Sequence, residues 1–199
     1  VWLLLLGTML LGGVGFLDDY LKVVKKMRNG LIARYKLAGQ VGVGLIVGAV
    51  LYFSPEFTDV QGLTTIPFFK DLNLDLQYLY IPAVIFIITA TSNAVNLTDG
   101  LDGLAIGLTI IAMLALGIIS YVSGNMIYSD YLNIIYLQGA GELTVFIAAL
   151  IGAGLGFLWY NFFPAQVFMG DTGSLALGGA LGIISVMVRK ELLLPILAG

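Results

Sequence analysis

The chain has 199 residues, of which 59% are hydrophobic and only 11% are charged. Soluble domains are usually about 45–50% apolar and about 25% charged. This difference, together with a mean hydropathy of +1.01, excludes an ordinary soluble domain and predicts a surface that lies largely in lipid. The sequence contains no Cys and no His, which excludes disulfides, thiol chemistry and the usual general base. Any catalysis must therefore depend on carboxylates, amides, lysines or a bound cation.

Apolar stretches follow one another along the chain. A helix that crosses a bilayer needs roughly 20 apolar residues. The sequence therefore predicts an all-α, polytopic transmembrane helix bundle of about six to seven spans, at about 1–17, 37–53, 79–97, 101–123, 143–163, 173–188 and, incompletely, 191–198. Segment 54–78 predicts a small external hairpin or a short helix. Glycines such as the Gly44-xxx-Gly48 pair and the run Gly152, Gly154 and Gly156 predict close helix packing.

No internal repeat or linker divides the chain, so we expect one transmembrane catalytic domain over 1–199. The chain begins without Met inside one apolar stretch and stops inside another. We therefore expect a fragment that is truncated at both ends.

Basic residues indicate the orientation. Six of the nine Lys and Arg residues lie between Lys22 and Lys36, and positively charged loops stay on the cytoplasmic side. Alternation then places 98–100 and 164–172 on that side, and 54–78 and 124–142 outside. Arg189 and Lys190 would lie outside, as a minor exception in a very short turn.

Three groups of acidic residues, distant in sequence, fall at this cytoplasmic membrane edge. One group ends the first span, one opens the fourth and one opens the sixth: Asp18 with Asp19, Asp99 with Asp102, and Asp171. Asp18 and Asp19 lie at a helix C-terminus, where the helix dipole opposes them. Lys22, at i+4 and i+3 from them, can neutralise one charge if the helix continues. A divalent cation can supply the rest, and the all-oxygen ligands suit Mg²⁺ or Mn²⁺.

Residues 93–103 (NAVNLTDGLDG) place two Asn, one Thr and two Asp within otherwise apolar sequence. Asp99 and Asp102 are three residues apart and would share one face of a helix. Polar groups in membrane segments are costly and usually functional. We therefore expect this segment to line a site.

Residues 161–174 (NFFPAQVFMGDTGS) form a second polar segment. Pro164 predicts a helix end, and the next helix can be capped by Asp171, Thr172 or Ser174. The free amides at such a helix N-terminus predict an anion site. With the basic loop on the same side, these parts suit phosphoryl transfer, in which catalysis is positioning plus charge neutralisation.

Three strings carry a family resemblance: GFLDDYLK at 15–22, residues 93–105, and WYNFFPAQVFMGDTGSLALGG at 159–179. Their wording, order and spacing resemble the phospho-N-acetylmuramoyl-pentapeptide transferase family along essentially the whole chain. The third string is the most specific. The wider superfamily of polyprenyl-phosphate phosphosugar transferases shares the acidic pattern but not this wording.

The resemblance implies a Mg²⁺-dependent enzyme of the bacterial cytoplasmic (inner) membrane, with its active site facing the cytoplasm. The enzyme would transfer phospho-MurNAc-pentapeptide from UDP-MurNAc-pentapeptide to undecaprenyl phosphate, releasing UMP, as the first lipid-linked step of peptidoglycan synthesis. It would be a homodimer, and no nucleic acid partner is expected. By motif, the catalytic residues would be Asp18, Asp19 and Asp171, with Asp171 also the Mg²⁺ ligand. The substrate-binding residues would be Lys22, Lys36, Asn93, Asn96, Asp99, Gly100, Leu101, Asp102, Asn161 and Phe168.

The chain departs from the family in one respect, because it lacks the family's His-rich motif near the C-terminus; we expect that motif beyond residue 199. Two other functions stay open. One is a polyprenyl-phosphate N-acetylhexosamine-1-phosphate transferase, and the other is an ion-coupled transporter, which would place its charges near the bilayer midplane. Direct attack by the lipid phosphate and a covalent phospho-enzyme on Asp18 or Asp19 are both compatible with the sequence.

Overall fold

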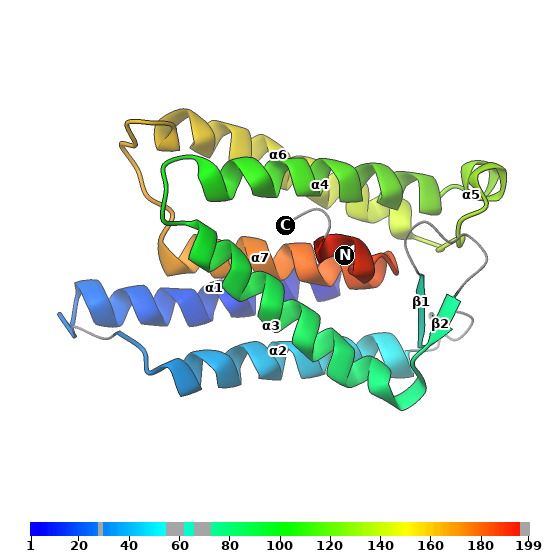
Figure 1. Ribbon diagram of the computed structural model, residues 1–199, viewed down its shortest axis with the longest axis horizontal. Coiled ribbons are helices and arrows are strands. Elements are labelled where there is room, and N and C mark those ends of the chain that lie inside the picture. Colours follow the sequence, from blue (N-terminus) through cyan, green and yellow to red (C-terminus); the bar gives the residue numbers. More distant parts are fainter. Residues whose placement is uncertain (28–29, 55–61, 66–72, 196–199) are drawn as a thin grey trace.

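The computed structural model describes residues 1–27, 30–54, 62–65 and 73–195 (Figure 1). Within these residues, six helices are long and apolar enough to cross a bilayer, which confirms the predicted polytopic all-α bundle. They are α1 (Trp2–Val23), α2 (Ala33–Phe53), α3 (Tyr80–Thr98), α4 (Leu104–Ser123), α6 (Ala140–Asn161) and α7 (Gly170–Met187). The shorter elements are β1 (Leu63–Thr65), β2 (Asn73–Asp75), η2 (Gln77–Leu79), α5 (Met126–Leu132) and η3 (Glu191–Leu193).

Helix α7 lies at the centre of the bundle. It packs mainly against α1 and α3, and less extensively against α4. Helix α2 packs on α3, whereas α4 pairs mainly with α6. In Figure 1, α4 and α6 form one layer above α7, α1 and α2 lie below α7, and α3 crosses in front of α7 and α1. The apolar contacts between α1, α3 and α7 are fully buried, as at Leu4, Ile88 and Ile183.

Glycines allow α7 to approach its neighbours closely. A Cβ atom on Gly178 of α7 would lie 2.5 Å from the carbonyl oxygen of Thr91 and 2.7 Å from Cα of Ser92, both on α3. Gly15 of α1 likewise has no room for a Cβ against the backbone of α7. Helices in lipid associate through such close contacts. Helix α7 therefore packs at short range against both α1 and α3.

Close helix packing was predicted at other glycines as well, and it is confirmed at only some of them. Gly44 contacts Ile85 of α3, and Gly154 contacts Ile106 and Ile110 of α4. For Gly152 and Gly156, nothing lies within 4 Å of an added Cβ. These two glycines therefore make no helix contact within the described part of the chain.

A hairpin closes the bundle at the end opposite to residues 99–103. Strands β1 and β2 pair antiparallel, with Leu63 opposite Asp75, which confirms the hairpin predicted within 54–78. The rest of that segment, 55–61 and 66–72, lies outside the described residues. The Thr65 hydroxyl donates a hydrogen bond to the carbonyl oxygen of Arg189 (2.6 Å), and the Thr64 hydroxyl donates to Glu191. The hairpin is thus attached to the chain just after α7.

Arg189, the exception to the charge pattern, is only 1% exposed. Its guanidinium group lies 4.6 Å from the centre of the Tyr80 ring, and such cation–π contacts stabilise a buried cation. Arg189 is therefore a structural residue, and its position carries little information about which loops face the cytoplasm.

Several predicted boundaries were wrong. Helix α1 continues to Val23 rather than stopping near residue 17, so Asp18 and Asp19 lie inside the helix and not at its end. Helix α4 begins only at Leu104, because Gly103 adopts a positive φ of 72°. Asp99 and Asp102 therefore lie in a turn between α3 and α4, and they do not share a helical face.

Two other predicted segments also differ. The expected loop at 124–142 contains α5, whose first turn is capped by Asn125, with Oδ1 accepting hydrogen bonds from the amides of Ile127 and Tyr128. In the segment predicted at 191–198, η3 forms at its start, and residues 196–199 lie outside the described part.

Candidate active site at the amino-terminal end of α7

Four helix ends meet at one end of the bundle. The last turns of α1 and α3 and the first turns of α2 and α7 lie together at the left of Figure 1. These four turns carry most of the polar residues that the sequence singled out. The fold therefore brings together side chains that are up to 153 residues apart.

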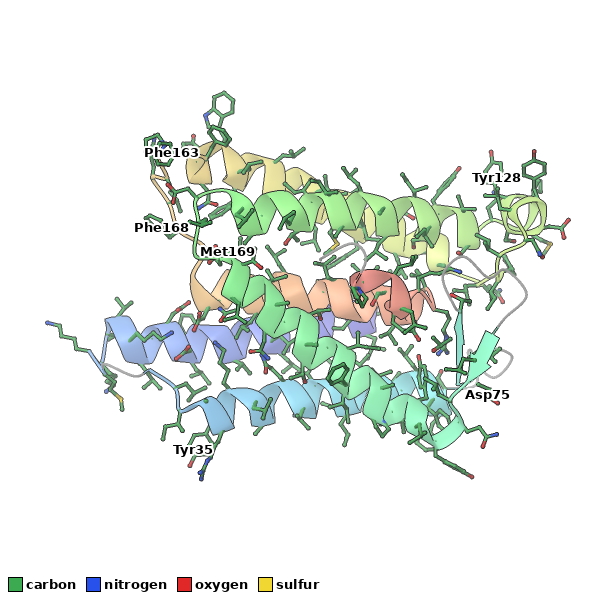
Figure 2. The ribbon with its side chains drawn as sticks, in the orientation of Figure 1. Tyr35, Asp75, Tyr128, Phe163, Phe168 and Met169 are labelled. Carbon is green, nitrogen blue, oxygen red and sulfur yellow. The ribbon has the colours of Figure 1, made fainter. Side chains whose placement is uncertain are left out.

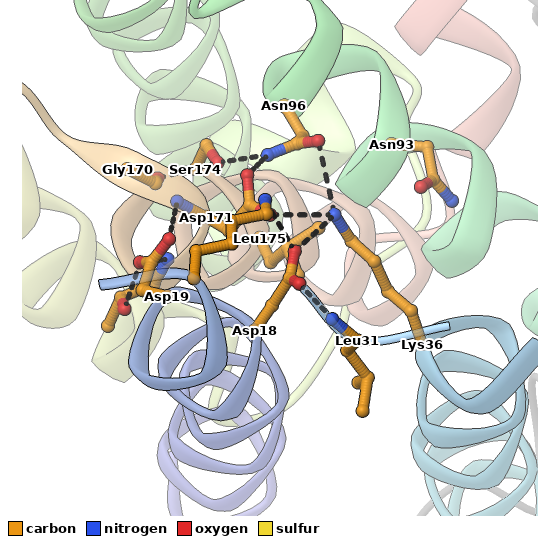
Figure 3. Close-up of polar contacts among 12 residues, drawn as sticks. Asp18, Asp19, Leu31, Lys36, Asn93, Asn96, Gly170, Asp171, Ser174 and Leu175 are labelled. Atoms are coloured by element: carbon orange, nitrogen blue, oxygen red, sulfur yellow. Dashed lines mark hydrogen bonds and ion pairs between the residues drawn. The ribbon is translucent and has the colours of Figure 1, made fainter. Parts of the chain in front are cut away.

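Two lysines and two aspartates form a charged cluster at this end, which we call the carboxylate–lysine cluster (Asp18, Lys22, Lys36 and Asp171). Nζ of Lys22 lies 2.9 Å from Asp18 Oδ2 and 2.7 Å from Asp171 Oδ2. Nζ of Lys36 lies 3.6 Å and 3.2 Å from the same two oxygens. The contacts join α1, α2 and α7 (Figure 3). Helix α1 continues to Lys22, so the predicted pair of Lys22 with Asp18 is confirmed.

Asp18 is the most buried member of the cluster, with only 4% of its side chain exposed. Its Oδ1 accepts a hydrogen bond from the backbone amide of Leu31 (2.6 Å), which folds the loop after α1 over the carboxylate. Gly30 has a positive φ of 57°, and a Cβ there would collide with Asp18. Both carboxylate oxygens of Asp18 are therefore engaged, one by the loop and one by the lysines.

Asp19 caps α7 rather than joining the cluster. Its carboxylate accepts hydrogen bonds from the backbone amides of Asp171 (3.2 Å) and Thr172 (2.8 Å) and from the Thr172 hydroxyl (2.6 Å). The positive end of the α7 dipole favours an anion there. The prediction that α7 is capped by its own Asp171, Thr172 or Ser174 was wrong, because α1 supplies the cap. The predicted anion site at these amides is occupied by Asp19.

Asn96 of α3 connects the cluster to the next turn of α7. Its amide Nδ2 donates to Asp171 Oδ1 (2.6 Å) and to the Ser174 hydroxyl (2.7 Å). Its Oδ1 accepts from Nζ of Lys36 (3.3 Å). Asn96 thus fixes the orientation of the Asp171 carboxylate (Figure 3).

Asn93 lies one helical turn before Asn96 but outside the cluster. Its Nδ2 donates to Oε1 of Gln40 (2.9 Å) and to the carbonyl oxygen of Thr89 (2.8 Å). No described residue of the cluster makes a hydrogen bond to Asn93. The structure therefore places Asn93 beside the site but does not join it to the carboxylates.

Asp99 directly follows α3, and its backbone amide donates to the carbonyl oxygen of Val95 (3.1 Å), but its carboxylate has no hydrogen bond or ion pair within the described residues. Burial raises the pKa of its carboxyl group, and the negative charges of Asp171 and Asp19 raise it further. Asp99 therefore experiences the charge of the site without a counter-cation of its own.

Two of the predicted site residues shape the loop between α6 and α7. Asp102 Oδ2 accepts from the backbone amide of Ala165 (3.0 Å). Asn161 accepts from the amide of Gly103 (3.1 Å) and donates to the carbonyl oxygen of Val167 (2.8 Å). These bonds hold the turn after α3 against the 162–169 loop. The side chains of Asp102 and Asn161 thus bind backbone groups in this structure.

The remaining predicted residues are exposed at the same end. Gly100 and Leu101 lie in the turn before α4, with Leu101 69% exposed. Phe168 is 73% exposed and lies beside Met169 in the loop before α7 (Figure 2). It also lines an apolar cavity of about 330 Å³ between α4, α6 and α7. An exposed aromatic ring here is free to stack on a planar ligand.

The carboxylate oxygens of the cluster are of the kind that Mg²⁺ prefers as ligands. No group of three or more Asp or Glu side chains gathers as a metal cage in the described part of the chain. Mg²⁺ is usually held by one or two carboxylates, with water and substrate phosphates completing its shell. Asp171 is the more accessible carboxylate, with 16% of its side chain exposed against 4% for Asp18. The residues present are therefore compatible with a metal held mainly through Asp171.

Sequence reasoning missed three contributors. Gln40 and Ser92 are buried polar residues next to the site, and the backbone amide of Leu31 binds Asp18. A lone amide inside the apolar stretch 37–53 was a usable signal for Gln40, because polar groups in lipid-facing spans are rarely accidental. The role of the Leu31 amide depends on how the loop folds, and because the group belongs to the backbone, residue type does not predict it.

These features define a class: a multi-pass membrane protein with a carboxylate–lysine cluster at the N-terminal end of its central helix. The chain belongs to glycosyl transferase family 4, whose profile matches residues 1–189.

Several similar curated proteins are named phospho-N-acetylmuramoyl-pentapeptide-transferase. The chain is 56% identical over 199 residues to the protein of that name from Chlorobium phaeobacteroides (strain BS1). It is 54% identical to that of Pelodictyon phaeoclathratiforme (strain DSM 5477 / BU-1) and 53% identical to that of Chloroherpeton thalassium (strain ATCC 35110 / GB-78). Each alignment covers 100% of this chain and 54% of the relative. The chain thus spans about half the length of the curated relatives it matches.

Proposed function

We propose that this chain forms the core of a transferase that moves phospho-MurNAc-pentapeptide from UDP-MurNAc-pentapeptide to undecaprenyl phosphate and releases UMP. The family and the name shared by the relatives support this reaction over transport. The observation that carries the proposal is the carboxylate–lysine cluster, in which side chains from three helices converge at one end of the bundle. A transporter would be expected to hold such charges near the bilayer midplane.

The chemistry requires two negatively charged phosphate groups to meet. A phosphate monoester has a second pKa near about 6, so the lipid phosphate is largely ionised at neutral pH and needs little help from a general base. The main barrier is therefore charge repulsion and positioning. Lys22 and Lys36 supply positive charge at one point, and Asp18 and Asp171 hold both ammonium groups there.

Direct displacement is the better supported route. Asp18 Oδ1 and Oδ2 and both oxygens of Asp19 already accept hydrogen bonds or ion pairs. A covalent phospho-enzyme would require one of these oxygens to give up its partners and attack phosphorus. We therefore assign Asp18 to holding the lysines and Asp19 to holding α7, with the lipid phosphate as the nucleophile.

Mg²⁺ belongs to the same proposal. Asp171 would be its protein ligand, and the ion would neutralise charge on the UMP leaving group. Asn96 would keep the Asp171 carboxylate in place through its 2.6 Å hydrogen bond. Phe168 would stack on the uracil ring, and Lys22 and Lys36 would exchange part of their contact with carboxylates for contact with phosphates.

The cellular setting is also proposed. The basic loop between α1 and α2 and the cluster lie at the same end, and positively charged loops stay in the cytoplasm. We place this end at the cytoplasmic face of the bacterial inner membrane, where a nucleotide-linked substrate is available. The homodimer implied by the resemblance is part of the same proposal.

The test is UMP release by the protein in its full natural length, in detergent with undecaprenyl phosphate. UDP-MurNAc-pentapeptide and UDP-GlcNAc would be compared, each with Mg²⁺ and with EDTA. We expect release only from the muramoyl substrate, only with the lipid, and none with EDTA. Release from UDP-GlcNAc would contradict the substrate assignment, and full activity in EDTA would contradict the metal.

A further inference from the structure

A buried chain of hydrogen bonds crosses the bundle next to the carboxylate–lysine cluster. It joins Gln40 of α2, Ser92 and Asn93 of α3, and the backbone of Leu175 in α7. Gln40 is 1% exposed and Ser92 is 0% exposed. Burying a primary amide in an apolar span is costly unless its groups are paired, so this arrangement requires explanation.

Backbone carbonyl oxygens at the two ends of this row of hydrogen bonds determine which group donates and which accepts in each bond. The Ser92 hydroxyl donates to the carbonyl oxygen of Leu175 (3.2 Å), and a carbonyl oxygen can only accept. The Ser92 oxygen then accepts from Nε2 of Gln40 (3.4 Å), which turns Oε1 of Gln40 toward Asn93. At the other end, Nδ2 of Asn93 faces the carbonyl oxygen of Thr89 (2.8 Å), so its amide orientation is fixed independently.

The consequence concerns what Asn93 can bind. An amide group has two N–H donors and one oxygen acceptor. Both donors of Asn93 are used, one by Gln40 (2.9 Å) and one by Thr89. Its Oδ1 receives no hydrogen bond from any described residue. Asn93 can therefore offer a ligand only an acceptor, which suits a hydroxyl or N–H group and not a phosphate oxygen.

Gln40 also lies one turn after Lys36 on α2. Residues four apart share one face of a helix. The face of α2 that presents Lys36 to Asp171 is thus the face that Gln40 ties to α3. Loss of this tie would release Asn93 and would loosen the helix that carries Lys36.

We propose that Gln40 is a positioning residue that holds Asn93 as a hydrogen-bond acceptor for a hydroxyl or N–H group of the UDP-sugar. The identity of that ligand rests on the proposed function. The bond directions themselves do not depend on it, because they follow from the backbone carbonyls at the two ends.

The test measures the Kd of the UDP-sugar by calorimetry, without the lipid acceptor, and UMP release in parallel. Variants of the full-length protein would be Gln40→Met, Gln40→Glu, Asn93→Ala and the Gln40→Met/Asn93→Ala double variant. One neutral hydrogen bond contributes about 0.5–1.5 kcal/mol, so Gln40→Met should weaken binding roughly 2- to 10-fold. The double variant should bind like Asn93→Ala alone, because Gln40 acts through Asn93.

Gln40→Glu provides a second readout. A buried carboxyl group favours its neutral form, which still accepts from Asn93 and donates to Ser92. Binding by this variant should therefore be near normal at low pH and should weaken as pH rises, relative to the unaltered protein. The matched control is Ser120→Ala, which removes a buried 2.6 Å bond between α4 and Ala140 near the opposite end of α4.

The outcomes separate the two proposals. Unchanged Kd in Gln40→Met, with only a lower melting temperature, would overturn the role of Gln40 and leave it a structural residue. Additive effects in the double variant would overturn it as well. Binding without UMP release by the unaltered protein would overturn the proposed function. The Kd values of the variants would still test whether Gln40 positions Asn93. Absence of binding by the unaltered protein would overturn both.

Discussion

Individual carboxylates at the α7 end have different surroundings, and these surroundings assign different tasks. Asp18 is buried under the loop and paired with two lysines, Asp19 is bound to the α7 amides, and Asp171 is paired but accessible. Asp99 differs from all three, because no Lys or Arg of the described residues forms an ion pair with it. Burial and the charges of Asp171 and Asp19 raise its pKa, so Asp99 retains its proton to higher pH than an ordinary aspartate.

This difference predicts a pH dependence of nucleotide binding. Below its raised pKa, Asp99 is neutral and does not repel the diphosphate of UDP; above it, Asp99 is charged and does. UDP affinity should therefore fall as pH rises through that pKa, and Asp99→Asn should remove this part of the dependence. UDP also titrates, so the quantity to measure by calorimetry is the difference between protein and variant at each pH. Parallel curves for the two proteins would contradict the assignment.

At the scale of the elements, α7 carries the site because it packs closely on α1 and α3. Gly178 permits α7 to approach α3, and the Ser92 hydroxyl can then reach the carbonyl oxygen of Leu175. Asp19 holds the first turn of α7 from the other side. The geometry of the candidate site thus depends on helix contacts made well inside the bundle.

Gly178→Ala should therefore be destabilising. The added methyl group would lie 2.5 Å from a backbone oxygen that has no room to move. Overpacking of this kind costs about 1–3 kcal/mol. Gly152→Ala is the matched control, because nothing lies within 4 Å of its Cβ and alanine is the better helix former by about 1 kcal/mol. Thermal unfolding in one detergent would compare them, and equal melting temperatures would contradict the close contact of α7 with α3.

The sequence predicted elements better than it predicted their ends. The six spans could be predicted because each helix needs about 20 apolar residues to cross a bilayer. The end of α1 could not, since Asp18 and Asp19 look like a terminus until one sees that Lys22 and α7 neutralise them. The fourth span begins three residues later than predicted, because Gly103 adopts a positive φ that composition does not show.

For the site, the sequence identified the acidic and basic residues but not their partners. Asp18, Lys22, Lys36, Asn96 and Asp171 do converge, as their common position at span ends indicated. The capping of α7 by Asp19 could not be predicted, because it joins residues more than 150 positions apart. Gln40 was missed because a single amide in an apolar stretch does not show what it contacts.

In the whole molecule, the two ends of the bundle differ: one gathers charged side chains into a site, and the other is closed by packed secondary-structure elements. The charged end holds the carboxylate–lysine cluster, and the opposite end holds the hairpin, α5 and the buried Arg189 (Figure 1). A reaction that brings two phosphates together requires positive charge where they meet, and Lys22 and Lys36 supply it, held there by Asp18 and Asp171. We therefore propose that this reaction takes place at the cluster.

The most direct measurement is the rate of UMP release from UDP-MurNAc-pentapeptide by Asp171→Asn beside Asp130→Asn, in the full-length protein. Each variant loses one negative charge, but Asp130 is exposed on α5 at the other end of the bundle. Losing a group that stabilises transition-state charge costs about 100- to 1,000-fold in rate. We predict a loss of that size for Asp171→Asn in protein that is still folded at the assay temperature, and a normal rate for Asp130→Asn. A normal rate for Asp171→Asn would contradict the assignment of catalysis to the cluster.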